Sequence, residues 1–318
     1  MTDQLDAAGR LRHLLTLDGL PAPMLQRLIE RARTFVPPAA AAAPRGRELE
    51  GRTVANLFME PSTRTRVSFE LAARRLGADV VNIEGSAAST VKGETLLDTV
   101  YTLQAMRTDL FVIRTAESGA PAEVARRVAD DVAVVSGGES HLSHPTQGLL
   151  DTLTILQRKP DLDRLVVCIV GDIAHSRVAR SAAQALRTLG VRELRLVSPP
   201  ELKPAPHEFP GATWDSGLDR MLVDADVIMA LRIQKERMSA TEIPGASAYR
   251  EQYGINRTRL ARARPDAIVM HPGPMNRGIE IESDVADGPQ SVIWTQVANG
   301  VAVRMAVLLT LAGRSQAR

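Results

Sequence analysis

Short apolar runs rich in β-branched residues alternate along this chain with segments whose apolar residues recur at helical spacing. The apolar runs form two sets, at residues 54–58, 80–83, 110–114 and 132–135 and at residues 165–170, 193–197, 227–231 and 267–270. The helical segments lie at residues 66–76, 96–106, 148–157, 177–189 and 290–311. Alternating strands and helices are typical of parallel sheets covered by helices on both faces. The pattern predicts an α/β fold with two doubly wound parallel-sheet domains of four strands each.

The chain length and the two sets of strands also indicate where the domains lie. A chain of 318 residues is longer than one hydrophobic core usually spans. We expect a first domain over residues 1–145 and a second over residues 146–296, with a C-terminal helix at about 297–318 packing back on the first. The alanine-rich segment 36–44 has prolines near both ends, and it predicts an exposed connector.

The overall composition, 44% apolar and 24% charged residues, is ordinary for a soluble globular protein. No uninterrupted apolar run reaches the length of a membrane span, and residues 1–12 lack the apolar stretch of a secretory signal. The single cysteine, Cys168, excludes an internal disulfide and a cysteine-based zinc site, and its apolar surroundings predict a buried thiol. We therefore expect a protein of the reducing cytoplasm.

Charge is nearly balanced, with 39 basic and 37 acidic residues and a net charge of +2. A nucleic-acid-binding protein normally needs a concentrated basic face, and aromatic residues, which stack on bases, make up only 3% of this chain. The composition therefore argues against nucleic acid as a partner. A site for small anions stays open, because it needs only a few arginines placed locally.

The strongest chemical signal is the sequence FMEPSTRTRVSFE at residues 58–70, where an apolar strand ends and a helix begins after a hydroxyl-rich turn. The first amides of a helix point outward without partners and carry the positive end of the helix dipole, which makes a ready anion site. Ser62, Thr63 and Thr65 add hydroxyl donors. Arg64 adds a guanidinium fork that matches phosphate. The simpler alternative is a helix N-cap by Ser62 or Thr63 with solvated arginines.

Further motifs follow in chain order. They are KGET at 92–95, HPTQ at 144–147, GD at 171–172, RIQKE at 232–236 and HPGP at 271–274. Arg114 ends a predicted strand, which is where open α/β sheets place their ligands. The GD turn follows a strand and precedes a helix, as in dinucleotide-binding proteins, but the sequence G-x-G-x-x-G is absent. A nicotinamide site is therefore not supported, and no cofactor is predicted.

Together these motifs resemble the transcarbamoylase family: STRTR at residues 62–66 is similar to its carbamoyl phosphate motif, and KGET and HPTQ are similar to motifs of its aspartate branch. The matches run from about Asn56 to Arg277. The resemblance implies transfer of the carbamoyl group of carbamoyl phosphate to the α-amine of L-aspartate, which gives N-carbamoyl-L-aspartate and phosphate early in pyrimidine biosynthesis. It also implies a homotrimer, with active sites between the two domains that are shared across the subunit interface. A larger assembly with regulatory or dihydroorotase-like chains stays open.

The same resemblance assigns roles to individual residues, with carbamoyl phosphate on the first domain and aspartate on the second. The expected catalytic residues are Arg64, Thr65, Arg114 and His144. The expected carbamoyl phosphate ligands are Ser62, Thr63, Arg64, Thr65, Arg114, His144, Gln147, Gly273 and Pro274. The expected aspartate ligands are Lys92, Arg177, Arg232 and Gln234.

The HPGP motif would act through its backbone. Its two prolines fix the chain, so that carbonyl groups can be aimed rigidly. By resemblance, the carbonyls of Pro272 and Gly273 accept hydrogen bonds from the amino groups of the substrates. His271 is expected to be structural rather than catalytic.

A segment rich in small residues, 84–93, resembles the family's lid, which carries a serine and a lysine into the neighbouring subunit's site. Lys92 matches the lysine. Ala88 stands where some members have the serine, and the adjacent Ser89 is a candidate replacement.

Other interpretations of these residues stay open. His141 and His144, with Glu139 nearby, have a spacing that a metal could use, but no convincing third ligand is evident and no metal site is predicted. An ornithine-specific relative would carry His-Cys-Leu-Pro in place of HPGP, and a cationic acceptor would want carboxylates where this chain has Arg177 and Arg232. A non-catalytic scaffold subunit would have lost some substrate ligands. A phosphate sensor would keep the anion site without needing the acceptor arginines.

Overall fold

The computed structural model describes residues 4–38, 41–85, 95–233 and 245–313. Two expected aspartate ligands, Lys92 and Gln234, lie outside these ranges, as do Ala88 and Ser89 of the predicted lid. The chain forms two compact units. Unit 1 comprises residues 1–149 and 299–318, and unit 2 comprises residues 150–298.

Unit 1 contains a four-stranded sheet in the order β2-β1-β3-β4, and every pairing in it is parallel. Its strands are β1 Thr53–Phe58, β2 Asp79–Glu84, β3 Leu110–Thr115 and β4 Ala133–Glu139. Every residue of β3 is buried, as expected for a central strand of a parallel sheet covered on both faces. Because all four strands run the same way, their carboxyl ends lie along one edge of the sheet.

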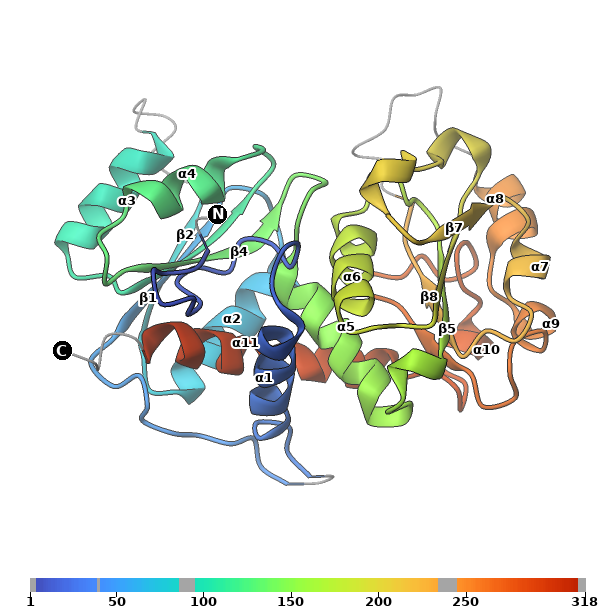
Figure 1. Cartoon of the computed structure of the whole chain (residues 1–318), viewed down its shortest axis with the longest axis horizontal. Helices are drawn as coiled ribbons and strands as arrows, with labels where there is room; N and C mark the ends of the chain where they lie inside the picture. Colours follow the sequence, from blue (N-terminus) through green and yellow to red (C-terminus); the bar gives the residue numbers. More distant parts are fainter. Residues whose placement is uncertain (1–3, 39–40, 86–94, 234–244, 314–318) are drawn as a thin grey trace. The chain divides into compact units, whose positions relative to one another are not determined.

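Helices lie on both sides of this sheet (Figure 1). They are α1 Ala22–Arg33, α2 Thr63–Arg75, α3 Leu96–Ala105, α4 Ala120–Arg127 and, from Asn299 onward, α11 Ile293–Ala312. Val100 of α3 and Val124 of α4 share a core cluster with Phe111 of β3. Phe69 of α2 is fully buried, and the guanidinium carbon of Arg304 in α11 lies 4.9 Å from the centre of its ring.

Unit 2 contains a five-stranded parallel sheet in the order β7-β6-β5-β8-β9. Its strands are β5 Val166–Val170, β6 Glu193–Val197, β7 Thr213–Asp215, β8 Val227–Ala230 and β9 Ile268–Met270. The sequence predicted four strands here and missed β7. This edge strand has three residues and no apolar run, and it pairs only with β6, so its strand character depends on that neighbour.

Alternate residues of β5 serve the two faces of the unit 2 sheet. Val167 and Ile169 belong to a cluster with residues of α5 Pro145–Arg158 and α6 Arg177–Thr188. Cys168 and Val170 belong to a second cluster, together with residues of several short helices. The remaining helices of this unit are α7 Leu218–Met221, α8 Ala246–Tyr253, α9 Arg257–Leu260 and α10 Ser283–Ala286, with 3₁₀ turns η2 Leu162–Arg164, η3 Pro200–Leu202 and η4 Pro206–Glu208. The predicted class, two parallel-sheet α/β domains, is confirmed.

Two smaller predictions are also confirmed. Cys168 is fully buried, and burial raises the pKa of its thiol to about 12. The described part of the connector, residues 36–38 and 41–44, contains no helix or strand and is exposed or partly exposed.

Within the described residues, one helix, α11, is long and apolar enough to cross a membrane by length and composition. The sequence pattern predicted a helix here but no apolar run of membrane-spanning length, because Gln296, Asn299 and Arg304 interrupt its apolar residues. In the structure, 61% of its most apolar stretch is buried inside the protein. A buried core helix passes the same test of length and composition, so we interpret α11 as part of the core.

Candidate active site

The anion cradle predicted in unit 1 is a strand-to-helix turn. Strand β1 ends at Phe58, and α2 begins at Thr63, three residues earlier than the sequence predicted. Ser62 occupies the N-cap position with an extended backbone, and its side chain makes no cap hydrogen bond. The simple capping interpretation is therefore not supported for Ser62. Thr65 is buried in the first turn of α2, and Arg64 beside it is exposed.

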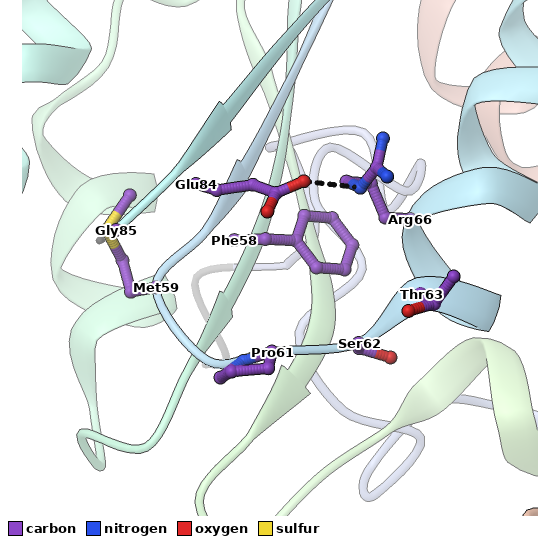
Figure 2. A pocket seen from close by; sticks show the side chains of 8 residues that line it. All are labelled: Phe58, Met59, Pro61, Ser62, Thr63, Arg66, Glu84 and Gly85. Carbon is purple, nitrogen blue, oxygen red and sulfur yellow. Dashed lines mark ion pairs between the residues drawn. The ribbon is translucent and has the colours of Figure 1, made fainter. Parts of the chain in front are cut away.

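A pocket of about 170 Å³ opens at this turn. Figure 2 shows Ser62 and Thr63 on one side of it and Glu84, from the end of β2, on the other. Glu84 is paired with Arg66, with 2.8 Å between Oε1 and Nε. Because a liquid water occupies about 30 Å³, the pocket has room for a small anion. Ser62, Thr63 and Arg66 all line the pocket, and the guanidinium of Arg66 is paired with the carboxylates of Glu84 and Glu70.

Arg114 lies at the end of β3 with 8% of its surface exposed. Its Nη2 donates to Oε1 of Glu60 at 3.1 Å, and its Nη1 donates to the carbonyl of Gly137 at 3.2 Å. The pairing of β3 with β4 shifts register between Ile113 and Arg114, and such irregularities re-aim strand-end side chains. Phe58 and Arg114 are partners across β1 and β3, so Arg114 leaves the sheet beside the cradle.

The sequence interpretation gave Glu60 no role, although the residue stands inside the strongest motif. In the structure Glu60 fixes the guanidinium of Arg114 from the same turn that carries Ser62. A carboxylate close to an expected anion site is unfavourable unless it is paired with a cation. The presence of an acid in this motif was therefore a signal that an arginine lies next to it.

His144 immediately precedes α5, Gln147 lies in its first turn, and both side chains are buried. The carbonyl of His144 accepts from the backbone amide of Gln147 at 2.9 Å, within the first helical turn. They follow β4, whose last residue, Glu139, bridges to Ser143, so this segment leaves the sheet at the same edge as Arg114. Burial raises the pKa of Glu139, partly offset by the amide of Gly119, which donates to its carboxylate at 2.6 Å.

The expected carbamoyl phosphate ligands between Ser62 and Gln147 are thus brought to the carboxyl edge of one sheet, at the ends of the strands β1, β3 and β4, whereas Gly273 and Pro274 belong to the other unit. Across the ranges that the structure describes, no group of three histidine, cysteine, aspartate or glutamate side chains is arranged to hold a metal.

The expected aspartate ligands that the structure describes lie at the carboxyl edge of the unit 2 sheet. Arg177 is the first residue of α6, which follows β5, and is 4% exposed. Arg232 follows β8 and is half-buried. Strands β5 and β8 are neighbours, with Val170 opposite Ala230, so both arginines leave adjacent strands at the same edge.

A second buried arginine on α6, Arg180, makes several contacts within unit 2. Arg180 donates to the carbonyl of Ala174 at 2.9 Å and pairs with Glu208, and its guanidinium lies 5.6 Å from the ring of Phe209. These contacts give Arg180 a structural role. Arg177, at the helix start, is the arginine that the resemblance had singled out.

The turn before α6 is built around Gly171 and Asp172. Asp172 is fully buried, and its Oδ1 accepts from the backbone amide of His175 at 3.1 Å and from Nδ1 of His175 at 2.9 Å. The side chain of Ser176 caps α6 by accepting from the amide of Ala179. These contacts fix where α6 begins, and therefore the position of Arg177, its first residue.

Gly171 permits the close approach of β5 and β8 at this edge. Its φ is +141°, and an added Cβ would lie 2.6 Å from the carbonyl oxygen of Leu231. Backbone cannot give way as a flexible side chain can, so Gly171→Ala is expected to destabilise the protein by about 2–3 kcal/mol. Urea denaturation measures this change.

Gly245→Ala is the matched control for that substitution. An added Cβ at Gly245 meets nothing within 4 Å and its φ is −58°, so the expected change comes only from alanine being a poorer N-cap of α8 and is within about 1 kcal/mol. Equal stability of the two variants would contradict the role assigned to Gly171.

The HPGP segment leaves the same edge, because it follows β9, the neighbour of β8. Gly273 has a φ of +67°, a left-handed conformation that favours glycine. His271 is fully buried, in agreement with a structural role, whereas Pro274 is exposed. Arg177, Arg232, Gly273 and Pro274 thus all belong to one edge of unit 2.

Two family models match the chain and together cover most of it. Residues 12–157 match the carbamoyl-P binding domain of aspartate/ornithine carbamoyltransferase, and residues 163–311 match the Asp/Orn binding domain of the same family.

Solved structures with either acceptor in their names are similar to the chain. Aspartate transcarbamoylase from Trypanosoma cruzi, in complex with N-(phosphonacetyl)-L-aspartic acid, is 30% identical over 96% of this chain and 98% of that chain, with a TM-score of 0.85. Ornithine carbamoyltransferase from Pyrococcus furiosus is 29% identical over 95% and 97%, with a TM-score of 0.83. The Thermus thermophilus ornithine enzyme is 25% identical over 95% and 99%, also with a TM-score of 0.83. Overall likeness therefore does not choose between the two acceptors.

Proposed function

The chain belongs to the aspartate/ornithine carbamoyltransferase family of transferases, and we propose that its acceptor is L-aspartate. The proposed reaction transfers the carbamoyl group of carbamoyl phosphate to the α-amine of L-aspartate. Its products are N-carbamoyl-L-aspartate and phosphate, which places the enzyme early in pyrimidine biosynthesis.

The observation that carries the choice of acceptor is the charge at the carboxyl edge of unit 2. Arg177 and Arg232 leave adjacent strands there, and guanidinium forks bind carboxylates in bidentate geometry. Among the described residues, the acids that follow β5 and β9, Asp172 and Glu280, are 0% and 1% exposed and accept hydrogen bonds from the protein itself. A dicarboxylate suits this edge, whereas the ammonium group of ornithine would need an accessible carboxylate.

The proposed chemistry begins with attack of the neutral amine on the carbamoyl carbon. A carbon–nitrogen bond forms, and the carbonyl electrons move onto oxygen to give a tetrahedral intermediate. Donors that are already in place stabilise such an oxyanion without reorganising, and Thr65, Arg114 and His144 are the residues proposed to do so. The role of Glu60 is then to hold Arg114 in position.

Collapse of the intermediate breaks the bond between the carbamoyl carbon and the phosphate oxygen. Phosphate leaves into the cradle of Ser62, Thr63, Arg64 and Thr65, where the helix amides and the guanidinium stabilise its charge. The departing phosphate takes the amine proton, so no dedicated protein base is required. Much of the rate is expected from holding two anions in reactive geometry.

Phosphate release from carbamoyl phosphate by the purified chain, with L-aspartate, with L-ornithine or with no acceptor, tests the proposal. We expect release only with L-aspartate, because the acceptor edge offers arginines. Release with ornithine alone would reassign Arg177 and Arg232. Absence of release with every acceptor, from folded protein, would favour a scaffold subunit or a phosphate sensor.

The proposal extends to assembly and location. We propose a cytoplasmic homotrimer in which Lys92 and Gln234 complete the aspartate ligands, with Lys92 supplied to a neighbouring subunit. Light scattering coupled to size-exclusion chromatography measures the mass of the assembly. A mass above that of a trimer in cell extract would indicate regulatory or dihydroorotase-like chains.

A further inference from the structure

A buried hydrogen-bond network in unit 2 holds the HPGP segment in place, and one of its members, Glu280, lies outside that segment. Oε1 of Glu280 accepts from Nε2 of His271 at 3.1 Å and from the backbone amide of Asn276 at 2.6 Å. Nδ1 of His271 accepts from the backbone amide of Gly273 at 2.8 Å. The imidazole therefore connects the carboxylate of Glu280 to the backbone at Gly273.

A second buried side chain holds the start of the segment. Oε1 of Gln296 accepts from the backbone amide of His271 at 3.0 Å. Nε2 of Gln296 donates to Oδ1 of Asp151 at 2.7 Å, so the orientation of the amide is set by a carboxylate that cannot donate. The backbone and the side chain of His271 are thus fixed independently.

These contacts define the tautomer of His271. Nδ1 receives an N–H donor and must carry a lone pair, so the imidazole proton resides on Nε2, where it is donated to Glu280. Without an acceptor at Nε2, the proton could move to Nδ1, and it would then oppose the amide of Gly273. Glu280 therefore selects the tautomer that can hold Gly273.

Within the described part of the chain, the hydrogen bonds of Glu280 are both accepted by Oε1, and both come from the segment from His271 to Asn276. Oε2 is buried and has no hydrogen-bond partner among the described residues, and the same is true of the hydroxyl of Tyr249. Burial, and then the carboxylates of Glu280 and Asp172, raise the pKa of Tyr249.

We propose that His271 and Glu280 are positioning residues for carbamoyl phosphate, with Glu280 fixing the imidazole of His271 and His271 holding the backbone of Gly273 in its binding conformation. This inference rests on the proposed contact between Gly273 and carbamoyl phosphate, and it is independent of the acceptor.

Two substitutions of His271 separate its two contacts. The polar atoms of an asparagine side chain lie near the position of Nδ1, and those of a glutamine side chain lie near the position of Nε2. His271→Asn keeps an acceptor for the amide of Gly273 and loses the contact with Glu280. His271→Gln keeps the donor to Glu280 and loses the acceptor for Gly273. Each variant removes one buried contact, so the two are expected to lose similar thermal stability.

Titration calorimetry with carbamoyl phosphate, in the absence of any acceptor, distinguishes the variants. We expect the Kd of His271→Gln to rise about tenfold above the wild-type value, and that of His271→Asn to rise less than about threefold. Equal Kd values in the two variants, whether changed or unchanged, would overturn the proposal and leave His271 a purely structural residue.

Substitution of Glu280 gives the corresponding test of tautomer selection. Glu280→Gln retains an acceptor oxygen for His271 and Asn276 and should bind carbamoyl phosphate within about threefold of wild type, whereas Glu280→Leu should lose about tenfold. Equal binding by these two variants would contradict the role of Glu280. No acceptor is present in these titrations, so an enzyme that used ornithine would give the same comparison of Kd values. Failure of the aspartate proposal would therefore be seen only in the phosphate-release assay.

Discussion

Arg64→Ala is expected to lower kcat by about 100- to 1,000-fold, the effect typical of removing one donor aimed at developing charge. Arg64 stands in the first turn of α2 and is exposed, so its truncation opens no cavity in the core. In the proposed reaction its guanidinium stabilises phosphate as the bond to the carbamoyl carbon breaks. Steady-state phosphate release at saturating carbamoyl phosphate and aspartate measures the change.

The matched control for this prediction is Arg74→Ala. Arg74 is also an exposed arginine of α2, paired with Glu70 at 3.0 Å, but it lies ten residues, or about 15 Å, further along the helix. Its kcat should stay within about twofold of wild type, because Arg74 lies away from the proposed cradle and because surface ion pairs contribute little to stability. Near-normal turnover in Arg64→Ala would contradict the proposed phosphate cradle.

Arg177→Ala is expected to raise the KM for aspartate by about 100-fold or more, because a buried guanidinium that pairs with a carboxylate is costly to lose. The KM for carbamoyl phosphate should change by less than about threefold, since its proposed side-chain ligands lie at the sheet of unit 1, and Gly273 and Pro274 follow a different strand, β9. Arg177→Lys retains the charge without the planar fork, so its KM for aspartate should lie between the values of the wild type and of Arg177→Ala. Initial rates over a grid of both substrate concentrations separate the two constants.

Arg187→Ala on the same helix is the control for a general effect of losing an arginine from α6. Arg187 is exposed near the end of α6, about 15 Å from Arg177, and its removal should leave both constants unchanged within about twofold. Thermal unfolding of Arg177→Ala must be measured as well, because Arg177 is 4% exposed. Parallel increases in both KM values would indicate a disturbed fold instead of a lost aspartate contact.

The identity of the candidate residues was available from the sequence, but the contacts that position them were not. The strings around Ser62, His144 and Arg177 each combine a strand end with a helix start, and the structure places each at the carboxyl edge of its own sheet. The assigned roles of these residues in catalysis stay predictions. Glu60 and Glu280 had no role in the sequence interpretation, because Glu60 holds an arginine from another strand and Glu280 meets His271 only through the folding of the segment after β9.

Strand character and helix character were determined by the sequence itself, since both depend on neighbours within a few positions and on the period at which apolar residues recur. This local information was sufficient for the alternation of elements and the α/β class. It was insufficient for β7, whose three residues gain their strand conformation only by pairing with β6. It also misjudged the start of α2 by three residues, where polar residues replace the periodic pattern.

The order of strands in each sheet was decided by the tertiary structure alone. Arg114 and Glu60 are 54 positions apart and meet only because β3 lies beside β1. Likewise, Arg177 and Arg232 share an edge because β5 and β8 are neighbours, at a distance that Gly171 permits. Which strands pair depends on burying both faces of a whole sheet at once, and that free energy belongs to no single segment of the sequence.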